Sequence, residues 1–155
     1  MEYVVRIEQF HSLPLAVVRR RAARQELSQV VPDACGTVWG VLRSHRVPGA
    51  GRHVAVYLDD QINLEVGVEL EAPFTRAGEV VGSATPPGPV ATTTHYGPYG
   101  RLHEAHEAIR RWCGNHGHPL AGPNWEVYGH WKAEWNSDPT KISTDVFYLL
   151  GGGPA

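Results

Sequence analysis

The sequence places one carboxylate, Glu126, inside its most aromatic stretch, residues 124–131. Aromatic and β-branched neighbours favour an extended strand, in which side chains point alternately to two faces. One face then carries Asn124, Glu126, Tyr128 and His130, and the other carries Trp125, Val127 and Trp131. A carboxylate in such a strand is costly unless a cation or a hydrogen-bond donor meets it. The pattern therefore predicts a ligand pocket whose wall contains Glu126.

The ligand that suits these side chains is an aromatic organic cation. A delocalised cation loses its hydration at low cost and lies flat on indole or phenol faces, for about 0.5–2 kcal/mol per well-placed contact. Contacts of this kind demand little direction, so one pocket accepts many shapes. Without a ligand, Glu126 is expected to be partly protonated or held by a hydroxyl group, because burial disfavours a charged carboxylate.

An internal repeat separates this interpretation from the simpler one, in which Glu126 is a strand carboxylate that points to water. A shift of 71 residues superimposes residues 45–57 on residues 116–128, and six of these thirteen ungapped positions are identical. The matched residues of the first copy are His45, Pro48, Ala50, Gly51, Val56 and Tyr57. The position of Glu126 is occupied by Ala55 in the first copy. Since alanine satisfies the module once, the repeat argues against a folding requirement for the carboxylate and favours a ligand contact.

Further aromatic and imidazole side chains are predicted to line the same site. Besides Glu126, the predicted ligand-binding residues are Tyr128, Trp39, His53, Tyr57, Trp131, Phe147 and Tyr148. Each has a structural alternative: the two repeat-related tyrosines can fill a core, and Trp131 can lie at a rim or an interface. Phe147 and Tyr148 are adjacent in a strand and face opposite ways, so one of them lines the site and the sequence does not say which.

Composition and charge argue against several other kinds of partner and compartment. The formal net charge is −2 and the sequence pI is near 6.5, which leaves no basic footprint for nucleic acid or an anionic membrane. The basic cluster Arg19–Arg21 is interpreted as a solvated strand end. The start of the sequence lacks a signal-peptide pattern, and no apolar run approaches the roughly 18–20 residues of a membrane span. Two cysteines without a disulfide spacing favour the cytoplasm.

Alternation and helical periodicity predict an α+β fold of two strand–helix–strand–strand modules. Strands are expected at residues 3–9, 15–21, 52–58, 62–70, 79–84, 89–96, 124–131 and 144–150, with a hairpin turn at 59–61. The modules are expected to be related by a pseudo-twofold axis, with antiparallel sheets and two helices flanking a central ligand groove. Residues 1–150 then form a single domain of two repeats, about 1–84 and 89–150, followed by a flexible tail at 151–155.

Two helices complete this scheme. The first is expected at residues 26–46, although Pro32 favours an alternative start after Asp33. The second opens at Pro98, with an apolar stripe of Leu102, Ala105, Ile109, Trp112 and Cys113. His103 and His106 have the three-residue spacing of helical metal ligands. Because no cysteine cluster or His-Glu-x-x-His run accompanies them, no metal and no cofactor is predicted.

The second half of the sequence resembles a known family. The motifs are Thr94-His95-Tyr96-Gly97-Pro98-Tyr99 with Leu102 and Trp112, Gly122-Pro123-Asn124-Trp125-Glu126-Val127-Tyr128, Asp138-Pro139 and Thr144-Asp145-Val146-Phe147-Tyr148-Leu149. This pattern is similar to that of the GyrI-like small-molecule-binding family, whose module is also the effector-binding domain of some AraC-type and MerR-type multidrug-responsive regulators. The resemblance covers nearly the whole chain and implies a stand-alone member.

The resemblance implies a duplicated fold with a central groove for lipophilic aromatic molecules, often cations. Glu126 matches the buried glutamate of the drug-binding members, and Tyr128 matches the tyrosine two residues later. The segment 129–135 is longer and more aromatic than the usual connection. The family implies two alternatives: hydrolysis of cyclopropane-bearing alkylating natural products, with Glu126 and Tyr128 as catalytic residues, and a weaker one, a protein interaction like that of a gyrase inhibitor. No protein partner is identified by the sequence.

Overall fold

The computed structural model describes residues 3–59 and 63–151, which form two compact units. The first unit comprises residues 11–86, and the second comprises the described residues up to Phe10 together with those from Pro87 onward. The N-terminal strand thus belongs to the second unit. The predicted tail at 152–155 and most of the predicted hairpin turn at 59–61 lie outside the described residues. None of the helices in the described ranges is long and apolar enough to cross a membrane.

The first unit is an antiparallel sheet with one long helix. Its elements are β2 (Pro14–Arg21), α1 (Leu27–Ser44), β3 (His53–Tyr57), β4 (Asn63–Glu69), β5 (Arg76–Ala77) and β6 (Val80–Ala84). The strands lie in the order β3-β4-β2-β6-β5. The buried face of α1 packs on β2 and β4 through Ala34, Cys35, Val38 and Leu42.

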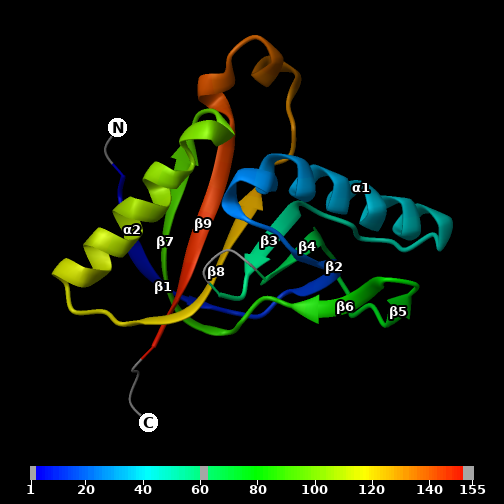
Figure 1. The fold of residues 1–155 in the computed structure, drawn as a ribbon, viewed down its shortest axis with the longest axis horizontal. Coiled ribbons are helices and arrows are strands. Elements are labelled where there is room, and N and C mark those ends of the chain that lie inside the picture. Colours follow the sequence, from blue (N-terminus) through cyan, green and yellow to red (C-terminus); the bar gives the residue numbers. More distant parts are fainter. Residues whose placement is uncertain (1–2, 60–62, 152–155) are drawn as a thin grey trace. The chain divides into compact units, whose positions relative to one another are not determined.

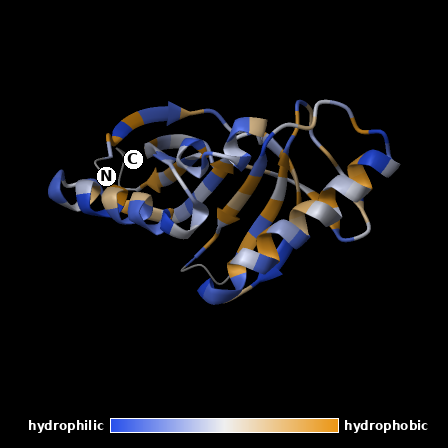
Figure 2. Ribbon diagram, turned by 90° about the horizontal axis from the view of Figure 1, so that it is seen from above, coloured by the Kyte–Doolittle hydropathy of each residue, from blue (hydrophilic) through white to orange (hydrophobic). Residues whose placement is uncertain are grey.

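The second unit repeats this plan with a shorter helix (Figure 1). Its elements are β1 (Arg6–Phe10), β7 (Gly88–Tyr96), α2 (His103–Asn115), β8 (Leu120–Tyr128) and β9 (Ser143–Leu150). The strands lie in the order β1-β7-β9-β8, and every pair is antiparallel. The helix packs on β7 and β9 through Ala105, Ile109 and Cys113. Hydrophobic and hydrophilic residues alternate along both helices, as Figure 2 shows.

The two units are copies of one α+β module, as the sequence predicted. The strand order β2-β4-β3 in the first unit is matched by β7-β9-β8 in the second. The same offset of 71 residues superimposes the four buried positions of the two helices. These pairs are Ala34 with Ala105, Cys35 with His106, Val38 with Ile109, and Leu42 with Cys113. The duplication therefore extends from the sequence to the buried side of each helix.

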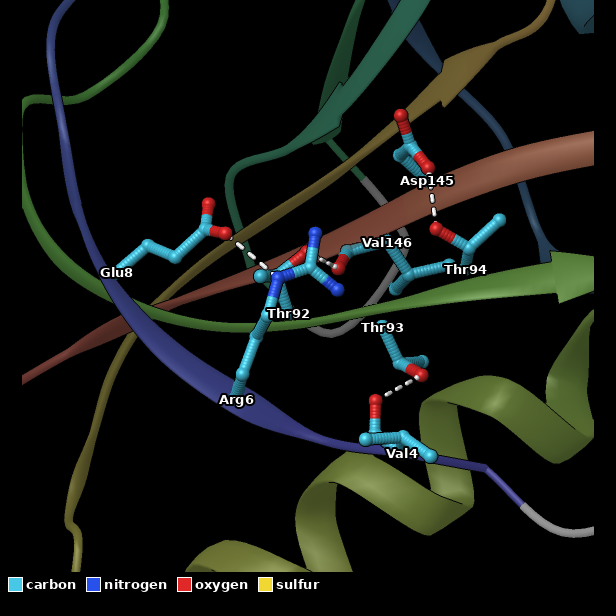
Figure 3. Close-up of polar contacts among 8 residues, drawn as sticks. All are labelled: Val4, Arg6, Glu8, Thr92, Thr93, Thr94, Asp145 and Val146. Atoms are coloured by element: carbon cyan, nitrogen blue, oxygen red, sulfur yellow. Dashed lines mark hydrogen bonds and ion pairs between the residues drawn. The ribbon is translucent and has the colours of Figure 1, made fainter.

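Threonine hydroxyls join the strands of the second unit to one another (Figure 3). Thr92 donates to the Val146 carbonyl over 2.8 Å, and Thr94 donates to the Asp145 carboxylate over 2.7 Å. Thr93 donates to the carbonyl of Val4 over 2.8 Å. These bonds connect β7 with β9 and with the segment before β1, so they add polar links to the backbone ladder that carries β8.

The first helix starts where residues 26–46 predicted, and the alternative start after Asp33 is wrong. A turn of 3-10 helix at Arg24–Glu26 leads into α1, which includes Pro32. Other predicted boundaries differ from the structure. Pro98 was predicted as the first residue of the second helix, but it has extended geometry, with ψ at 149°, and precedes the helix. The strand predicted at 124–131 ends at Tyr128, because its partner β9 begins at Ser143, and the last bond of the pair joins Gly129 N–H to the Ser143 carbonyl.

Both cysteines lie in the helix–sheet cores, and burial raises the pKa of Cys35 to about 12 and also raises that of Cys113. At pH 8 neither thiol is therefore expected to form much thiolate. We expect the native protein to release almost no chromophore from a thiol-reactive disulfide reagent at this pH. After unfolding in denaturant, two equivalents per chain should react, in line with the two cysteines of the sequence. Rapid reaction of native Cys35 would contradict its burial.

Candidate functional site

Glu126 lies on β8, on the face of the sheet that α2 adjoins. Its cross-strand partner is Val146 on β9, a member of the core cluster packed against α2. Because α2 makes its main contacts with β7 and β9, the helix stands beside β8 on this face. The exposed fraction of Glu126 is 5%, which excludes the interpretation that its carboxylate points to water.

Two side chains from different elements hold the carboxylate. The Tyr128 hydroxyl donates to Oε1 over 2.6 Å, from two residues further along β8. His106 Nε2 donates to Oε2 over 2.6 Å, from the second turn of α2. His106 is itself 3% exposed, so the contact is shielded from water. The expectation that a hydroxyl holds Glu126 is therefore met, and an imidazole holds it as well.

The other nitrogen of His106 continues the network to the surface. Nδ1 lies 2.6 Å from the Tyr148 hydroxyl, and the edge of the Tyr148 ring faces the imidazole. The exposed Arg110, one turn after His106, donates from Nη1 to the same hydroxyl over 2.7 Å. Its guanidinium also lies 6.0 Å from the centre of the Tyr148 ring. A continuous hydrogen-bonded chain thus runs from Arg110 through Tyr148 and His106 to Glu126.

This chain accommodates more than one proton arrangement. His106 Nε2 donates to the carboxylate whether the ring is neutral or an imidazolium. In the neutral ring, Nδ1 accepts from the Tyr148 hydroxyl; in the imidazolium, Nδ1 donates to the Tyr148 oxygen. The Glu126 carboxylate therefore keeps both of the donors described above while the charge of its surroundings changes by one proton.

Two tyrosines lie at the outer side of the carboxylate. Tyr128 is half-buried, and its ring is nearly perpendicular to that of Tyr99, at a centroid distance of 5.7 Å. Tyr99 is 45% exposed, and partial burial raises the pKa of its phenol. The hydroxyl that covers Oε1 thus belongs to a ring that reaches toward solvent beside a second phenol.

Phe147 and Tyr148 lie on opposite faces of β9, and Tyr148 is the one on the face of Glu126. Tyr148 shares the face of Glu126, since it is the cross-strand partner of Asn124 and bonds to His106. Phe147 points to the opposite face, where its ring stacks on that of Trp125 at 5.5 Å with an interplanar angle of 13°. Phe10 completes this aromatic cluster on the far side of the sheet.

The predicted residues of the first unit form a counterpart on β3. Trp39, half-buried on α1 as its flank position predicted, donates its Nε1 hydrogen to His53 Nε2. His53, Ala55 and Tyr57 share one face of β3, and Tyr57 is 3% exposed. Trp39 and His53 therefore meet each other, in the positions that Arg110 and Asn124 occupy in the second unit.

Trp131 lies outside the strand on which the sequence placed it. It is 54% exposed in the connection after β8, donates to Asn136 Oδ1 over 3.1 Å and packs edge-on against Trp135. Trp135 is 3% exposed, so it anchors this connection while Trp131 remains at the surface.

A small cavity lies elsewhere in the second unit. Its volume is about 90 Å³, and its lining includes Tyr3, His95, Pro98, Arg101 and Glu104 but, within the described ranges, none of the predicted ligand-binding residues. A drug-sized ligand needs roughly 300 Å³ or more. Both ring nitrogens of His95 are engaged, with the Tyr3 hydroxyl at 2.8 Å and the Pro98 carbonyl at 3.1 Å. In the described part of the chain, no group of three or more metal-ligating side chains is found.

The sequence did not identify His106 as the partner of Glu126, although the repeat contains a signal. The offset of 71 residues places Cys35 opposite His106 and Ala55 opposite Glu126. Both residues that meet in the second unit thus replace small or apolar residues of the first. A search for polar residues that change together between repeat copies would have selected this pair.

Comparison with known proteins yields likeness at the level of structure. No family model matches the sequence, and no curated protein matches it. The crystal structure of the EcmrR C-terminal domain has a TM-score of 0.78 at 18% identity, over 99% of this chain and 100% of that one. SAV2435 bound to tetraphenylphosphonium has a TM-score of 0.66 at 13% identity, over 98% and 95%. A hydrolase from Listeria innocua has a TM-score of 0.62 at 9% identity, over 95% and 91%.

At these identities the likeness concerns the fold. The matches extend over nearly the full length of this chain, and they include the C-terminal domain of EcmrR and a protein solved with tetraphenylphosphonium. The chain therefore has the fold of the GyrI-like small-molecule-binding proteins, as the resemblance of its sequence predicted.

Proposed function

We propose that this protein binds lipophilic aromatic cations and that Glu126 neutralises their charge. The observation that carries the proposal is a carboxylate, 5% exposed, held on one oxygen by a phenol and on the other by an imidazole. Both donors belong to flat rings, which also offer faces and edges to an aromatic guest. The site is thus suited to a guest that combines a positive charge with apolar surface.

Comparison of the two units supports a ligand role for this carboxylate. In the first unit, the positions of His106, Glu126 and Tyr148 are occupied by Cys35, Ala55 and Val68. The module therefore folds with an apolar set at the same three places. Burying a carboxylate and an imidazole is costly and seldom improves stability over a packed apolar core. A function is the simplest reason for retaining the polar set.

A cation can reach Glu126 by exchanging with one of its donors. The Tyr128 hydroxyl is the better candidate, because its ring is half-buried next to the exposed Tyr99, whereas His106 is on the buried side of α2 and is 3% exposed. The exchange replaces a neutral donor by a full positive charge in a poorly hydrated site, where electrostatic attraction is stronger than in water. SAV2435, which was solved with tetraphenylphosphonium, supports the choice of ligand class by its fold.

A pair of dyes with one aromatic frame, one cationic and one neutral, tests the proposal. Glu126→Gln is expected to weaken binding of the cationic dye by about 10- to 100-fold, and that of the neutral dye by much less. Glu65→Gln is the matched control, because Glu65 is 7% exposed and is held by Arg19 and Ser83 in the first unit. A role for the charge of Glu126 would be refuted if Glu126→Gln reduced the affinity for both dyes equally. It would also be refuted if Glu65→Gln reduced the affinity for the cationic dye as much as Glu126→Gln does.

The exchange at Tyr128 makes a prediction of opposite sign. Tyr128→Phe keeps the ring and removes the hydroxyl that competes with the guest for Oε1. A hydrogen bond to a charged group contributes about 1.5–3 kcal/mol, part of which water recovers, so the cationic dye should bind up to about tenfold more tightly. Affinity for the neutral dye should stay constant. Weaker binding of the cationic dye, measured by the same titration, would show that the hydroxyl assists the guest.

Hydrolysis of a strained electrophile is the second candidate. It is favoured by the buried Glu126 carboxylate, which His106 and Tyr128 orient and which can accept a proton from an attacking water as a general base. The fold is shared with a Listeria innocua protein described as a hydrolase. Turnover of a cyclopropane-bearing alkylator beyond one equivalent, lost in Glu126→Gln, would establish catalysis. Product limited to one equivalent would leave binding alone.

A further inference from the structure

Asn124, two residues before Glu126 on the same face of β8, has a polar atom without a partner. The residue is 7% exposed, and its Oδ1 makes no hydrogen bond to any described residue. Its Nδ2 donates to the Gly122 carbonyl over 3.4 Å. A flipped amide would set two oxygens against each other, so this contact assigns the partnerless atom as the carbonyl oxygen. The atom that lacks a partner is therefore an acceptor.

Buried acceptors are nearly always satisfied in folded proteins, and exceptions call for a physical reason. The fold does not require an unpaired acceptor at this position, as the first unit shows. In the first unit the same position is occupied by His53, whose Nε2 accepts from Trp39. The position that Trp39 occupies carries Arg110 in the second unit, and Arg110 bonds to Tyr148 instead. In the second unit the side chain at the donor position thus bonds to Tyr148, and the acceptor at Asn124 is left without a donor.

The location of Asn124 connects it with the proposed cation site. Alternate residues of a strand are about 6.6 Å apart on one face, so the side chains of Asn124 and Glu126 are close enough for one small charged group to contact both. Tyr148, the cross-strand partner of Asn124, also bonds to His106. The two other buried atoms without partners fit less well: Trp125 Nε1 lies on the opposite face, and the Thr144 hydroxyl lies opposite Tyr128, on the other side of Glu126.

We propose that the preferred guest is an aromatic cation whose charged group carries N–H bonds, such as a protonated amine or an amidinium. One N–H of the charged group donates to the Glu126 carboxylate, and a second N–H of the same group donates to Asn124 Oδ1. A quaternary ammonium or a phosphonium has no N–H and leaves the Asn124 oxygen unsatisfied. The inference rests on the proposed cation site and adds a specificity-determining residue to it.

A protonated benzylic-type amine and its fully N-methylated analogue, which share one aromatic frame and one charge, provide the test. Titration is done at a pH at which the amine is fully protonated. The protein is expected to bind the amine about tenfold more tightly, which corresponds to about 1.4 kcal/mol. Asn124→Leu, which has a similar volume, should remove this preference and keep the affinity for the quaternary analogue. The same variant should raise the thermal unfolding midpoint without ligand, because it removes a buried acceptor that has no partner.

The outcomes separate this inference from the proposed function. If both cations bind equally to the unaltered protein and both depend on Glu126, the cation site stands and the N–H preference is refuted. If neither binds, the proposed function fails. Should Asn124→Leu not fold, Asn124→Ser replaces it, and a preference that this variant leaves unchanged would likewise refute the role of Asn124.

Discussion

The double variant His106→Cys/Glu126→Ala is expected to be much more stable than the sum of its two single changes predicts. Glu126→Ala alone leaves His106 Nε2–H without its carboxylate, and His106→Cys alone leaves Glu126 Oε2 without its imidazole. Breaking one partner of a buried charged pair costs about 3–5 kcal/mol, whereas an apolar replacement of the whole pair is often neutral. The first unit already uses Cys35 and Ala55 at these positions. We therefore expect a coupling free energy of about 2–3 kcal/mol in favour of the double variant.

Urea unfolding of the four proteins measures this coupling. His106→Cys combined with Glu65→Ala serves as the control, because Glu65 belongs to the first unit and bonds to Arg19 and Ser83. That second cycle should be additive within about 0.5 kcal/mol, as for distant sites. Additive free energies of unfolding in the first cycle would contradict a direct interaction between His106 and Glu126.

Trp125→Ala is expected to cause a large loss of stability in the second unit. The indole is fully buried and lies between Phe10 and Phe147. Removing such a side chain costs about 3–5 kcal/mol, because the apolar contacts are lost and a cavity remains. Trp125→Phe should cost clearly less, since it keeps an aromatic ring and removes the buried Nε1–H that lacks a partner.

Trp131→Ala is the matched control for this effect. Trp131 is 54% exposed, so the Trp131→Ala change should alter the free energy of unfolding of the protein by no more than about 0.5 kcal/mol. Denaturant unfolding followed by far-UV circular dichroism compares the three variants without relying on tryptophan fluorescence. If Trp131→Ala lowers the free energy of unfolding as much as Trp125→Ala does, the prediction that the buried Trp125 contributes more to stability is wrong.

Much of the fold was predictable because the sequence contains an internal repeat, so the same pattern of strands and helix occurs twice. The strand that carries Glu126 and Tyr128 was read from alternation, and the duplication was read from the match of residues 45–57 with 116–128. Alternation also predicted that Glu126 and Tyr128 share a face, and the bond between them follows from that placement. Local periodicity is sufficient for features of this kind, since both residues lie on one strand.

The partner of the carboxylate was not predictable in the same way. His106 interrupts the apolar stripe of its helix, so a search for hydrophobic periodicity reads it as an imperfection of the pattern. Its meeting with Glu126 depends on how α2 packs against the sheet, across 20 residues of sequence. The choice between Phe147 and Tyr148 depends likewise on which face α2 covers. Asn124 was placed on the correct face, but the absence of a partner for its oxygen is a property of packing.

A structure of the protein in complex with a lipophilic aromatic cation would show directly whether Glu126 binds the positive charge. We expect the charged group to lie next to the Glu126 carboxylate, with the bond between Tyr128 and Oε1 broken and the aromatic part against the rings of Tyr128 and Tyr99. A cation bound only elsewhere, for example at the cavity beside Tyr3 and His95, with both hydrogen bonds of Glu126 intact, would contradict it.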